Sequence, residues 1–298
     1  MHDKPNLRAW LLLVLLSLIW GSSFILIKKS LVVLTPLEIG SLRMLSASLV
    51  LLPIALSRLK HVSLIQIKYM IPVGLSGSFI PAFLFAIAQT HLASSITGIF
   101  NALTPLFTVL VGVTLFAQKE KAKVFIGVFI GLIGAIILIA STSGSDLNQF
   151  NYYALFVVLA TILYAINSNL IKFKLHGLKA VTITSISMLI VGPFSMLILV
   201  FFTDYFQKFG VEGIGLATFY MSLLGIIGTA VALIIFNKLV QLTSPLFTSS
   251  VTYLIPIVAI TWGVLDGETI VLSHLIGMLF ILIGISISNR QKKAGTPA

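Results

Sequence analysis

Residues 103–112 read LTPLFTVLVG, and residues 254–263 read LIPIVAITWG. In both stretches a proline stands seven residues before a glycine, within an apolar run. The same seven-residue spacing recurs further along each half, between Gly127 and Gly134 and between Gly277 and Gly284. The offset between the halves is 151 residues for the prolines and 150 residues for the later glycines. The chain therefore contains an internal repeat, with one residue gained or lost in the loop between these markers.

The composition places this repeat in a membrane. Of the 298 residues, 58% are hydrophobic and 9% are charged, and the mean hydropathy is +1.12. Soluble domains carry about 25% charged residues. Lys4 and Arg8 precede a long apolar run that ends at Lys28-Lys29 with no clear cleavage pattern. We interpret that run as a retained first span rather than a signal peptide.

Ten segments are long and apolar enough to cross a bilayer, which takes about 20 residues of helix. They are residues 9–28, 36–57, 69–90, 93–116, 123–141, 151–171, 180–203, 214–237, 246–265 and 271–289. Because each half has five spans, an odd number, the second half begins on the opposite side of the membrane from the first. We therefore predict an all-α integral membrane fold of ten transmembrane helices in two inverted five-helix repeats. The repeats are expected at residues 1–145 and at residues 146–298, the latter with a short C-terminal tail.

The basic residues lie mostly on one side of the predicted spans. If the N-terminus is cytoplasmic, 15 of the 19 Lys and Arg residues face the cytoplasm, and Lys28, Lys29 and Lys208 face the other side. This bias follows the positive-inside rule and predicts a multi-pass protein of the cell (inner or plasma) membrane with both termini cytoplasmic. The net charge of +11 is then explained by topology, so we predict no nucleic-acid partner.

Several short motifs in these spans point to a known family. They are Trp20-Gly21-Ser22-Ser23-Phe24, Arg43, Pro105, Pro256 and the pair Gly267-Glu268, which ends nine residues before Gly277. Over about residues 8–290 the chain resembles the EamA-type branch of the drug/metabolite transporter superfamily. The resemblance implies ten helices, cytoplasmic termini, a central cavity between the halves, and export or exchange of small metabolites. The chain departs from the pattern at Gln118, where the first repeat would carry the glutamate matched by Glu268.

Two prolines within predicted spans favour a polar cavity near the middle of the bilayer. A proline at position i leaves the carbonyl at i−4 without its helical donor, so Pro105 frees the carbonyl of Asn101 and Pro256 frees that of Thr252. Such groups are tolerated only where protein or a wet cavity compensates them. We predict helix breaks at both prolines, with Asn101 and Thr252 binding polar groups of the substrate.

The fourth span also carries a polar stripe. Thr97, Asn101, Thr104 and Thr108 follow a 4-3-4 spacing, which places them on one helical face. We predict that this face lines the cavity. The alternative is that the threonines bond their own helix and Asn101 bonds a neighbouring helix, as polar side chains in membranes commonly do.

Arg43 is the one strong charge well inside a predicted span. A charge at that depth costs roughly 2.5–3.5 kcal/mol on insertion scales, so it is a functional-site hypothesis by default. We interpret Arg43 as attracting a carboxylate or phosphate of the substrate. The alternative is a structural anchor bonded to carbonyls of a neighbouring helix. Its repeat partner is Ser187, so the symmetry does not require the charge.

Two pairs of residues recur at an offset of 144 between the halves. Lys28 and Lys172 stand at opposite membrane faces, and we predict a pair of charged gates; the alternative is snorkelling of lysine to the interface. Trp20 and Tyr164 stand in mid-span beside small residues, and we predict that they shape the substrate pocket; the alternative is helix packing. A pocket role is also predicted for two further side chains, Asn167 and Tyr253.

Glycines give two of the spans a small-residue face, namely Gly127, Gly131 and Gly134 on the fifth span and Gly277 and Gly284 on the tenth. Such faces let helices approach closely. We expect them to pack within the fold, and a homodimer interface is the alternative.

Catalytic patterns are missing from the sequence. There is no His-Glu-x-x-His, Gly-x-Ser-x-Gly or phosphate-loop motif, no cysteine, and the five histidines are scattered, so we predict no metal, no cofactor and no enzymatic activity. Inverted repeats are a recurring architecture of alternating-access transporters. We therefore predict a transporter of small metabolites that works by facilitated diffusion or exchange. The favoured substrates are amino acids or related compounds, moved in the export direction. The alternatives are a membrane-embedded enzyme acting on lipid or lipid-linked substrates, and a non-transporting scaffold.

Overall fold

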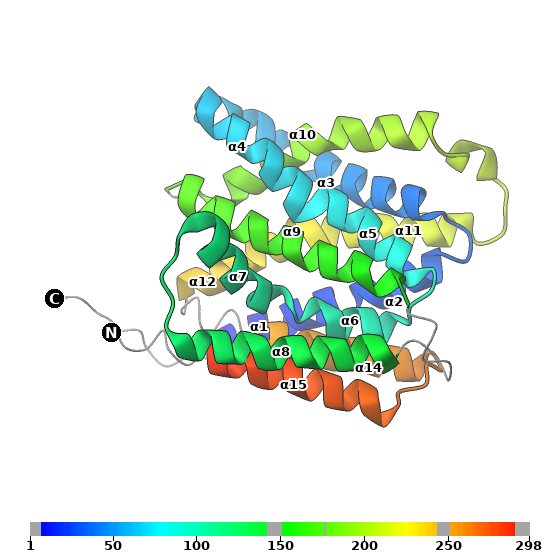
Figure 1. Ribbon diagram of the computed structural model, residues 1–298. Coiled ribbons are helices and arrows are strands. Elements are labelled where there is room, and N and C mark those ends of the chain that lie inside the picture. The colour runs from blue at the N-terminus through cyan, green and yellow to red at the C-terminus, as the bar shows by residue number, and fades with distance from the viewer. Residues whose placement is uncertain (1–6, 142–150, 176, 243–250, 290–298) are drawn as a thin grey trace.

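The computed structural model describes residues 7–141, 151–175, 177–242 and 251–289, which form helices joined by short connections (Figure 1). The first half contains α1 (Leu7–Gly21), α2 (Ser23–Ser30), α3 (Pro36–Leu59), α4 (Leu64–Gly74), η1 (Leu75–Phe79), α5 (Ile80–Gln89), α6 (Ser94–Asn101), α7 (Thr104–Phe116) and α8 (Ala122–Ser141). The second half contains α9 (Tyr153–Lys174), α10 (Ala180–Phe201), η2 (Tyr205–Lys208), α11 (Ile214–Gly225), η3 (Ile226–Val231), α12 (Ala232–Leu242), α14 (Val251–Leu265) and α15 (Leu272–Asn289).

Eight stretches of described helix are long and apolar enough to span a membrane. They are Leu7–Ser30, Pro36–Leu59, Leu64–Gln89, Ser94–Phe116, Ala122–Ser141, Tyr153–Lys174, Ala180–Phe201 and Ile214–Phe236. Two shorter apolar helices, Val251–Leu265 and Leu272–Ser288, complete the set of ten. The described helices overlap the predicted spans, of which the ninth begins at residue 246, outside the described residues, and the all-α, multi-pass membrane fold is confirmed. The predicted boundary between residues 145 and 146 lies outside the described residues.

Helix caps fix where some spans begin. α3 starts with Pro36 in its first turn, and Thr35 and Glu38 form a capping box in which each side chain bonds the other's backbone N–H. Ser63 and Gln66 form the same arrangement at the start of α4. Each box satisfies two backbone donors that a helix start would otherwise leave unpaired.

The repeat is visible in local structure as well as in sequence. η1 and η3 are short π-helical segments inside the third and eighth spans, and they begin at Leu75 and Ile226, again 151 residues apart. Single π-helical turns are rare in proteins, and those that occur are often found at functional sites. In this chain both segments contribute residues to the central cavity described below.

Equivalent helices of the two halves pack against each other. α8 packs along α15, and α3 packs along α10, as Figure 1 shows at opposite edges of the bundle. On the α8–α15 side the approach requires glycine: a Cβ on Gly134 would lie 2.6 Å from the carbonyl oxygen of Gly277, and one on Gly277 would lie 3.0 Å from that of Gly134. The two glycine faces therefore meet each other within the chain, so a homodimer would have to use another surface.

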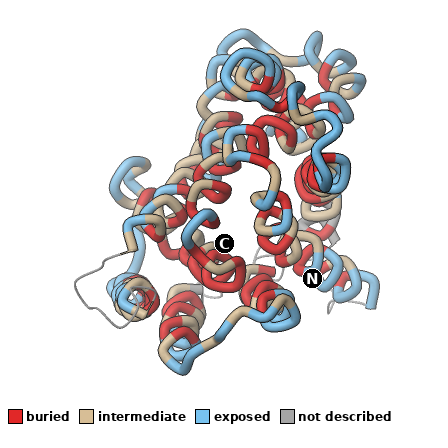
Figure 2. The backbone as a smooth tube through the Cα atoms, turned by 90° about the vertical axis from the view of Figure 1, so that its right-hand side faces the viewer, coloured by how far each residue is buried: buried red, intermediate tan, exposed pale blue. Residues whose placement is uncertain are grey.

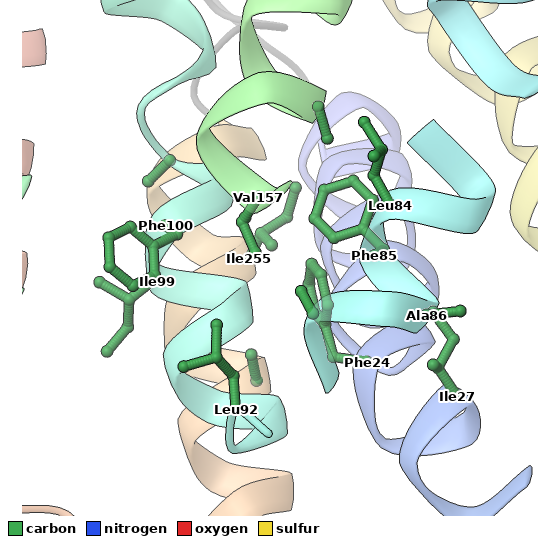
Figure 3. Packing of buried hydrophobic residues seen from close by; sticks show 14 of the residues in the cluster. Phe24, Ile27, Leu84, Phe85, Ala86, Leu92, Ile99, Phe100, Val157 and Ile255 are labelled. Atoms are coloured by element: carbon green, nitrogen blue, oxygen red, sulfur yellow. The ribbon is translucent and has the colours of Figure 1, made fainter. Parts of the chain in front are cut away.

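The largest cluster of buried side chains draws on both halves, and two smaller clusters lie beside it. Seen along the helices in Figure 2, the buried parts of the chain face the interior and the exposed parts face outward. Close by (Figure 3), Phe24 and Phe85 of the first half pack with Val157 and Ile255 of the second half. The rings of Phe24 and Phe85 meet edge to face, with centroids 5.8 Å apart.

The bundle has two ends, which we name by the residue that marks each. The Gln118 end holds the start of α8, the end of α7 and the end of α9, where Lys172 lies. The Glu268 end holds the end of α2, the start of α6 and the connection from α14 to α15.

Candidate transport cavity and its closed end

A cavity of about 780 Å³ lies between the two halves. Both repeats line it, through α1, α2, α3, η1, α5, α6, α7 and α8 of the first half and α9, η3, α12, α14 and α15 of the second. The predicted site residues on its wall are Trp20, Arg43, Asn101, Thr104, Pro105, Tyr164, Asn167, Lys172 and Thr252. Cavities of 300–1,000 Å³ are typical of sites for small ligands.

The cavity reaches the surface at the Gln118 end. Its wall there includes Lys119, Glu120 and Lys121, which are exposed. From this end the wall continues inward to Arg43 and Ile27. A solute entering beside Lys121 would therefore travel toward Arg43.

The fourth span breaks where the sequence predicts it. α6 ends at Asn101 and α7 begins at Thr104, with Pro105 in its first turn. The carbonyl of Asn101 nevertheless accepts a hydrogen bond from the Thr104 hydroxyl at 2.8 Å, so the expectation of an unpartnered carbonyl there is corrected. The Asn101 side chain remains the group that this break presents to the cavity.

The ninth span differs from this pattern. Pro256 lies inside the continuous helix α14 and is buried, so the predicted break at Pro256 does not occur within the described residues. Thr252, one turn earlier, lies on the cavity wall. The two halves therefore present a broken and an unbroken helix at equivalent positions.

Two predicted wall residues lie elsewhere. Thr97 is fully buried, and its hydroxyl donates to the carbonyl of Ala93 at 3.0 Å. Tyr253 packs against the hydrophobic core. The predicted single face therefore holds only in part: Asn101, Thr104 and Thr108 line the cavity, whereas Thr97, one turn before Asn101 in α6, bonds its own helix as in the alternative interpretation.

The two π-helical segments hold the aromatic and amide side chains of the pocket. The indole Nε1 of Trp20 donates to the carbonyl of Gly228 in η3 at 3.0 Å. At the equivalent place in the other half, a Cβ on Gly77 of η1 would lie 2.6 Å from the Asn167 side chain. Tyr164 stacks on Phe85 with centroids 6.0 Å apart.

Arg43 lies on the cavity wall, eighth in α3. Its Nε is buried and has no hydrogen-bond partner, and no carboxylate of a described residue forms an ion pair with it. The side chain interacts electrostatically with Tyr164.

A cluster of polar residues closes the Glu268 end, and we name it the Glu268 cluster: Lys28, Lys29, Ser94, Ser95, Asp266 and Glu268. Lys28 Nζ lies 2.8 Å from Glu268 Oε1 and 2.7 Å from Asp266 Oδ2, and Lys29 pairs with Asp266. Ile27 lines the cavity, whereas Lys28, the next residue, lines a separate hollow at the outer surface of this end. The cluster therefore stands between the cavity and that surface.

Glu268 also caps the start of α6. Its Oε1 accepts from Ser94 N at 2.9 Å and Ser94 Oγ at 2.8 Å, and its Oε2 accepts from Ser95 N at 3.0 Å and Ser95 Oγ at 2.5 Å. A carboxylate at a helix N-terminus is favoured by the free N–H groups and the helix dipole. One side chain thereby joins α2, α6 and the end of α14.

The cluster favours the ionised form of Glu268. Burial opposes ionisation, but the hydrogen bonds from Lys28, Ser95 and Ser94 outweigh it and lower the pKa of Glu268 to about 2. Hydrogen bonds from Lys28 and Lys29 also lower the pKa of Asp266 below its usual value. Both carboxylates are therefore charged at neutral pH.

Gln118 occupies the matching place at the other end. Its Oε1 accepts from Lys172 Nζ at 3.1 Å, and its Nε2 donates to Asn169 Oδ1 at 2.6 Å. Asn169 is buried, and its own Nδ2 donates to the carbonyls of Thr108 and Ala165, which fixes Oδ1 toward Gln118. An amide can accept from Lys172 and donate to Asn169 at once, whereas a carboxylate only accepts; this explains the departure from glutamate.

Matching glycines make room for these two side chains. A Cβ on Gly112 would overlap the Gln118 amide, and a Cβ on Gly263 would overlap the Glu268 carboxylate. The backbone N–H groups of Gln118 and Glu268 also return to the carbonyls of Gly112 and Gly263, at 3.0 and 2.8 Å. The glycine of each repeat thus leaves space for one polar side chain at each end.

A second ion pair ties the Glu268 end together. Lys208 Nζ lies 2.7 Å from Glu38 Oε2, and the same oxygen accepts from the Thr35 backbone N–H at 2.7 Å. Glu38 is completely buried. Its position is explained by the cap of α3 and by the contact with Lys208 of η2, which joins the second span to the connection between the seventh and eighth spans.

The sequence reasoning did not assign Asp266, Ser94, Ser95 or Lys29 to the closure. A signal was present, because Lys28-Lys29 and the acids Asp266 and Glu268 were all expected on the same side of the membrane. Counting both signs of charge at each side, rather than lysine and arginine alone, would have paired them.

A multi-helix membrane bundle with a cavity between two repeats is typical of one class of protein, the membrane transporters with internal repeats. Residues 7–140 and 151–290 each match the model of the EamA-like transporter family. The chain belongs to this family and is a multi-pass membrane transporter.

The chain is similar to two transporters described as uncharacterized. One, from Archaeoglobus fulgidus, is 23% identical over 290 residues, which cover 96% of this chain and 100% of that protein. The other, the inner membrane transporter YedA of Escherichia coli K12, is 27% identical over 260 residues, covering 86% of this chain and 82% of YedA. A solved crystal structure shares the fold with a TM-score of 0.63 at 17% identity, covering 96% of this chain and 99% of that one.

Proposed function

We propose that this transporter moves small metabolites, amino acids or related compounds, out of the cytoplasm by alternating access, as facilitated diffusion or exchange. The observation that carries the proposal is the contrast between the two ends of one cavity. The wall reaches exposed residues at the Gln118 end, while the Glu268 cluster bars the other end.

The repeat supplies the second state. Lys28 and Glu268 at one end correspond to Lys172 and Gln118 at the other, through the offsets 144 and 150. Because the halves have opposite orientations, an exchange of their conformations would open the Glu268 end and close the Gln118 end. The substrate would bias these states only through a difference in its affinity for them.

The sidedness follows from the basic residues. Lysines gather at the Gln118 end, as Lys119, Lys121 and Lys172 on the cavity wall illustrate, and such an excess marks the cytoplasmic face. On this assignment both termini are cytoplasmic, and the structure represents a state open to the cytoplasm. A cavity loaded from that side suits export.

Counterflow in proteoliposomes tests the proposal. Labelled amino acids, nucleosides and sugars would be compared for wild type, for Asn101→Ala on the cavity wall, and for Thr97→Ala, a neighbouring buried residue away from the wall. Saturable flux of one class, reduced by Asn101→Ala and retained by Thr97→Ala, is expected. Absence of flux from protein shown to be folded would refute the transport of these compounds, and equal loss in both variants would refute the assignment of the site.

A further inference from the structure

We propose that the central cavity selects organic anions, and that Arg43 determines this specificity by binding a carboxylate of the substrate. Among compounds related to amino acids, N-acylated amino acids and 2-oxo acids would then be preferred to the zwitterions. The inference rests on the proposed transport function and narrows its substrate class.

Arg43 lies deep in its span and has no ion-pair partner among the described residues. From the start of α3 the helix rises about 10 Å to reach it, so it lies well within the span. Its Nε is buried without a hydrogen-bond partner, and it pairs with no carboxylate among the described residues. Arg43 as a whole is half-buried and lines the cavity, where an anion of the substrate can compensate a charge that is costly to remove from water. The alternative of an anchor bonded to neighbouring carbonyls has no support, because no hydrogen bond from the guanidinium to a described carbonyl occurs.

The described cavity wall carries an excess of positive charge. It has four cationic side chains, Arg43, Lys119, Lys121 and Lys172, against one carboxylate, Glu120. Clefts lined by one sign of charge concentrate ligands of the opposite sign. Glu120 is exposed at the mouth, so the deep part of the described wall contains a cation and no acid.

The deep part of the described wall offers an ammonium group uncharged acceptors, such as Asn167 Oδ1 and Thr229 Oγ1, which are buried without a partner, but no carboxylate to balance its charge. Two backbone carbonyls on the wall are already bonded, that of Asn101 by the Thr104 hydroxyl and that of Gly228 by the Trp20 indole. A zwitterion would bring its ammonium close to the guanidinium when its carboxylate binds there. Acylation or oxidation of the amine removes that positive charge and so removes the repulsion.

The rest of the wall fits an apolar body attached to the carboxylate. Trp20, Phe24, Phe85, Tyr164 and Phe236 all line the cavity, and aromatic side chains bind apolar and planar groups well. The substrate class that matches both features is a carboxylate with an apolar or aromatic group.

A charge series on fixed side chains tests this inference without any mutation. Phenylalanine, N-acetylphenylalanine, phenylpyruvate and phenylalanine amide carry net charges of 0, −1, −1 and +1 at neutral pH, and the same series is made for leucine and alanine. Each compound is added unlabelled to wild-type proteoliposomes, and its inhibition of counterflow of the labelled compound that they transport is measured. We expect the two anions to compete about tenfold more strongly than the zwitterion, and the amide not to compete.

Three variants then assign the selectivity. Arg43→Gln should weaken binding of the anions by about 10- to 100-fold, the loss expected for a hydrogen-bonded charge pair, and should leave zwitterions nearly unchanged. Arg43→Lys should retain most of the preference. Arg8→Gln removes an arginine that is exposed in α1 and serves as the matched control.

The outcomes separate the two proposals. Flux of zwitterions that equals or exceeds flux of the anions would overturn the inference and leave the transport function standing. An anion preference that survives in folded Arg43→Gln would overturn the role of Arg43. Absence of flux for the whole series and for the wider metabolite panel, from folded protein, would overturn both.

Discussion

Replacing Glu268 by glutamine should open the Glu268 end of the cavity. The cluster lowers the pKa of Glu268 from its ordinary 4.5 to about 2, which corresponds to roughly 3 kcal/mol at about 1.4 kcal/mol per tenfold change. If the carboxylate is hydrated once this end opens, neutralising it removes up to that amount from the closed state alone. The population open at the Glu268 end should then rise by as much as about 100-fold.

The absence of cysteine from the chain makes a direct assay possible. Val109→Cys places one thiol on the cavity wall, at a side chain with no polar role. On the proposed assignment of the Gln118 end to the cytoplasm, a membrane-impermeant maleimide reaches the Glu268 side in right-side-out membrane vesicles and the Gln118 side in inside-out vesicles. In the parent, labelling should be fast only from the Gln118 side, and Glu268→Gln should accelerate labelling from the other side.

The matched control removes a carboxylate that takes no part in the closure. Glu120→Gln lies at the Gln118 end, where Glu120 is exposed, and should leave labelling from the Glu268 side unchanged. Labelling of folded Glu268→Gln that stays within threefold of the parent would show that the Glu268 cluster does not hold this end closed.

Further predictions follow from the same geometry. Gly263→Ala, whose Cβ would overlap the Glu268 carboxylate, should open that end in the same labelling assay, while Gly215→Ala, with open space around it, should not. Because the folded pKa of Glu268 is depressed, its stabilisation is complete above about pH 4.5 and is lost toward pH 2. The ratio of labelling from the Glu268 side to labelling from the Gln118 side, in which the pH dependence of the thiol itself cancels, should therefore be constant between about pH 6 and 8 and rise in acid; a transition of this ratio near neutral pH would contradict the assignment. Gln118→Glu should lower the melting temperature in detergent by an amount equivalent to about 1–2 kcal/mol, since a buried acceptor loses its donor, and an unchanged value would refute the role of the amide. Gly284→Leu should prevent accumulation of folded protein through overpacking between α8 and α15, which size-exclusion chromatography would detect, with Gly215→Leu as its control.

The membrane fold was accessible from sequence because a bilayer imposes strong, local requirements. Each span must be long, apolar and internally hydrogen-bonded, so the ten segments could be counted from hydropathy alone. The repeat could be read from the spacing of proline and glycine, and the break at Pro105 from the chemistry of proline.

The consequences of those local features depended on neighbours that the sequence does not display. The carbonyl of Asn101 is bonded by Thr104, and Pro256 stays within an unbroken helix. Thr97 is buried one turn before Asn101, and its hydroxyl bonds the carbonyl of Ala93 in its own helix, so it does not line the cavity.

The sequence by itself determined the spans, the repeat and the presence of one deep cation. Only the tertiary structure decided that Lys28 forms ion pairs with Asp266 and Glu268, which are 238 and 240 positions away in the chain. It also decided that Gln118 forms hydrogen bonds with Asn169 and Lys172 at the other end. Hydropathy and helix geometry act over one or two turns, so they are written locally in the sequence. Ion pairs and hydrogen bonds between helices depend on distances of about 3 Å between residues far apart in the chain, which packing alone determines.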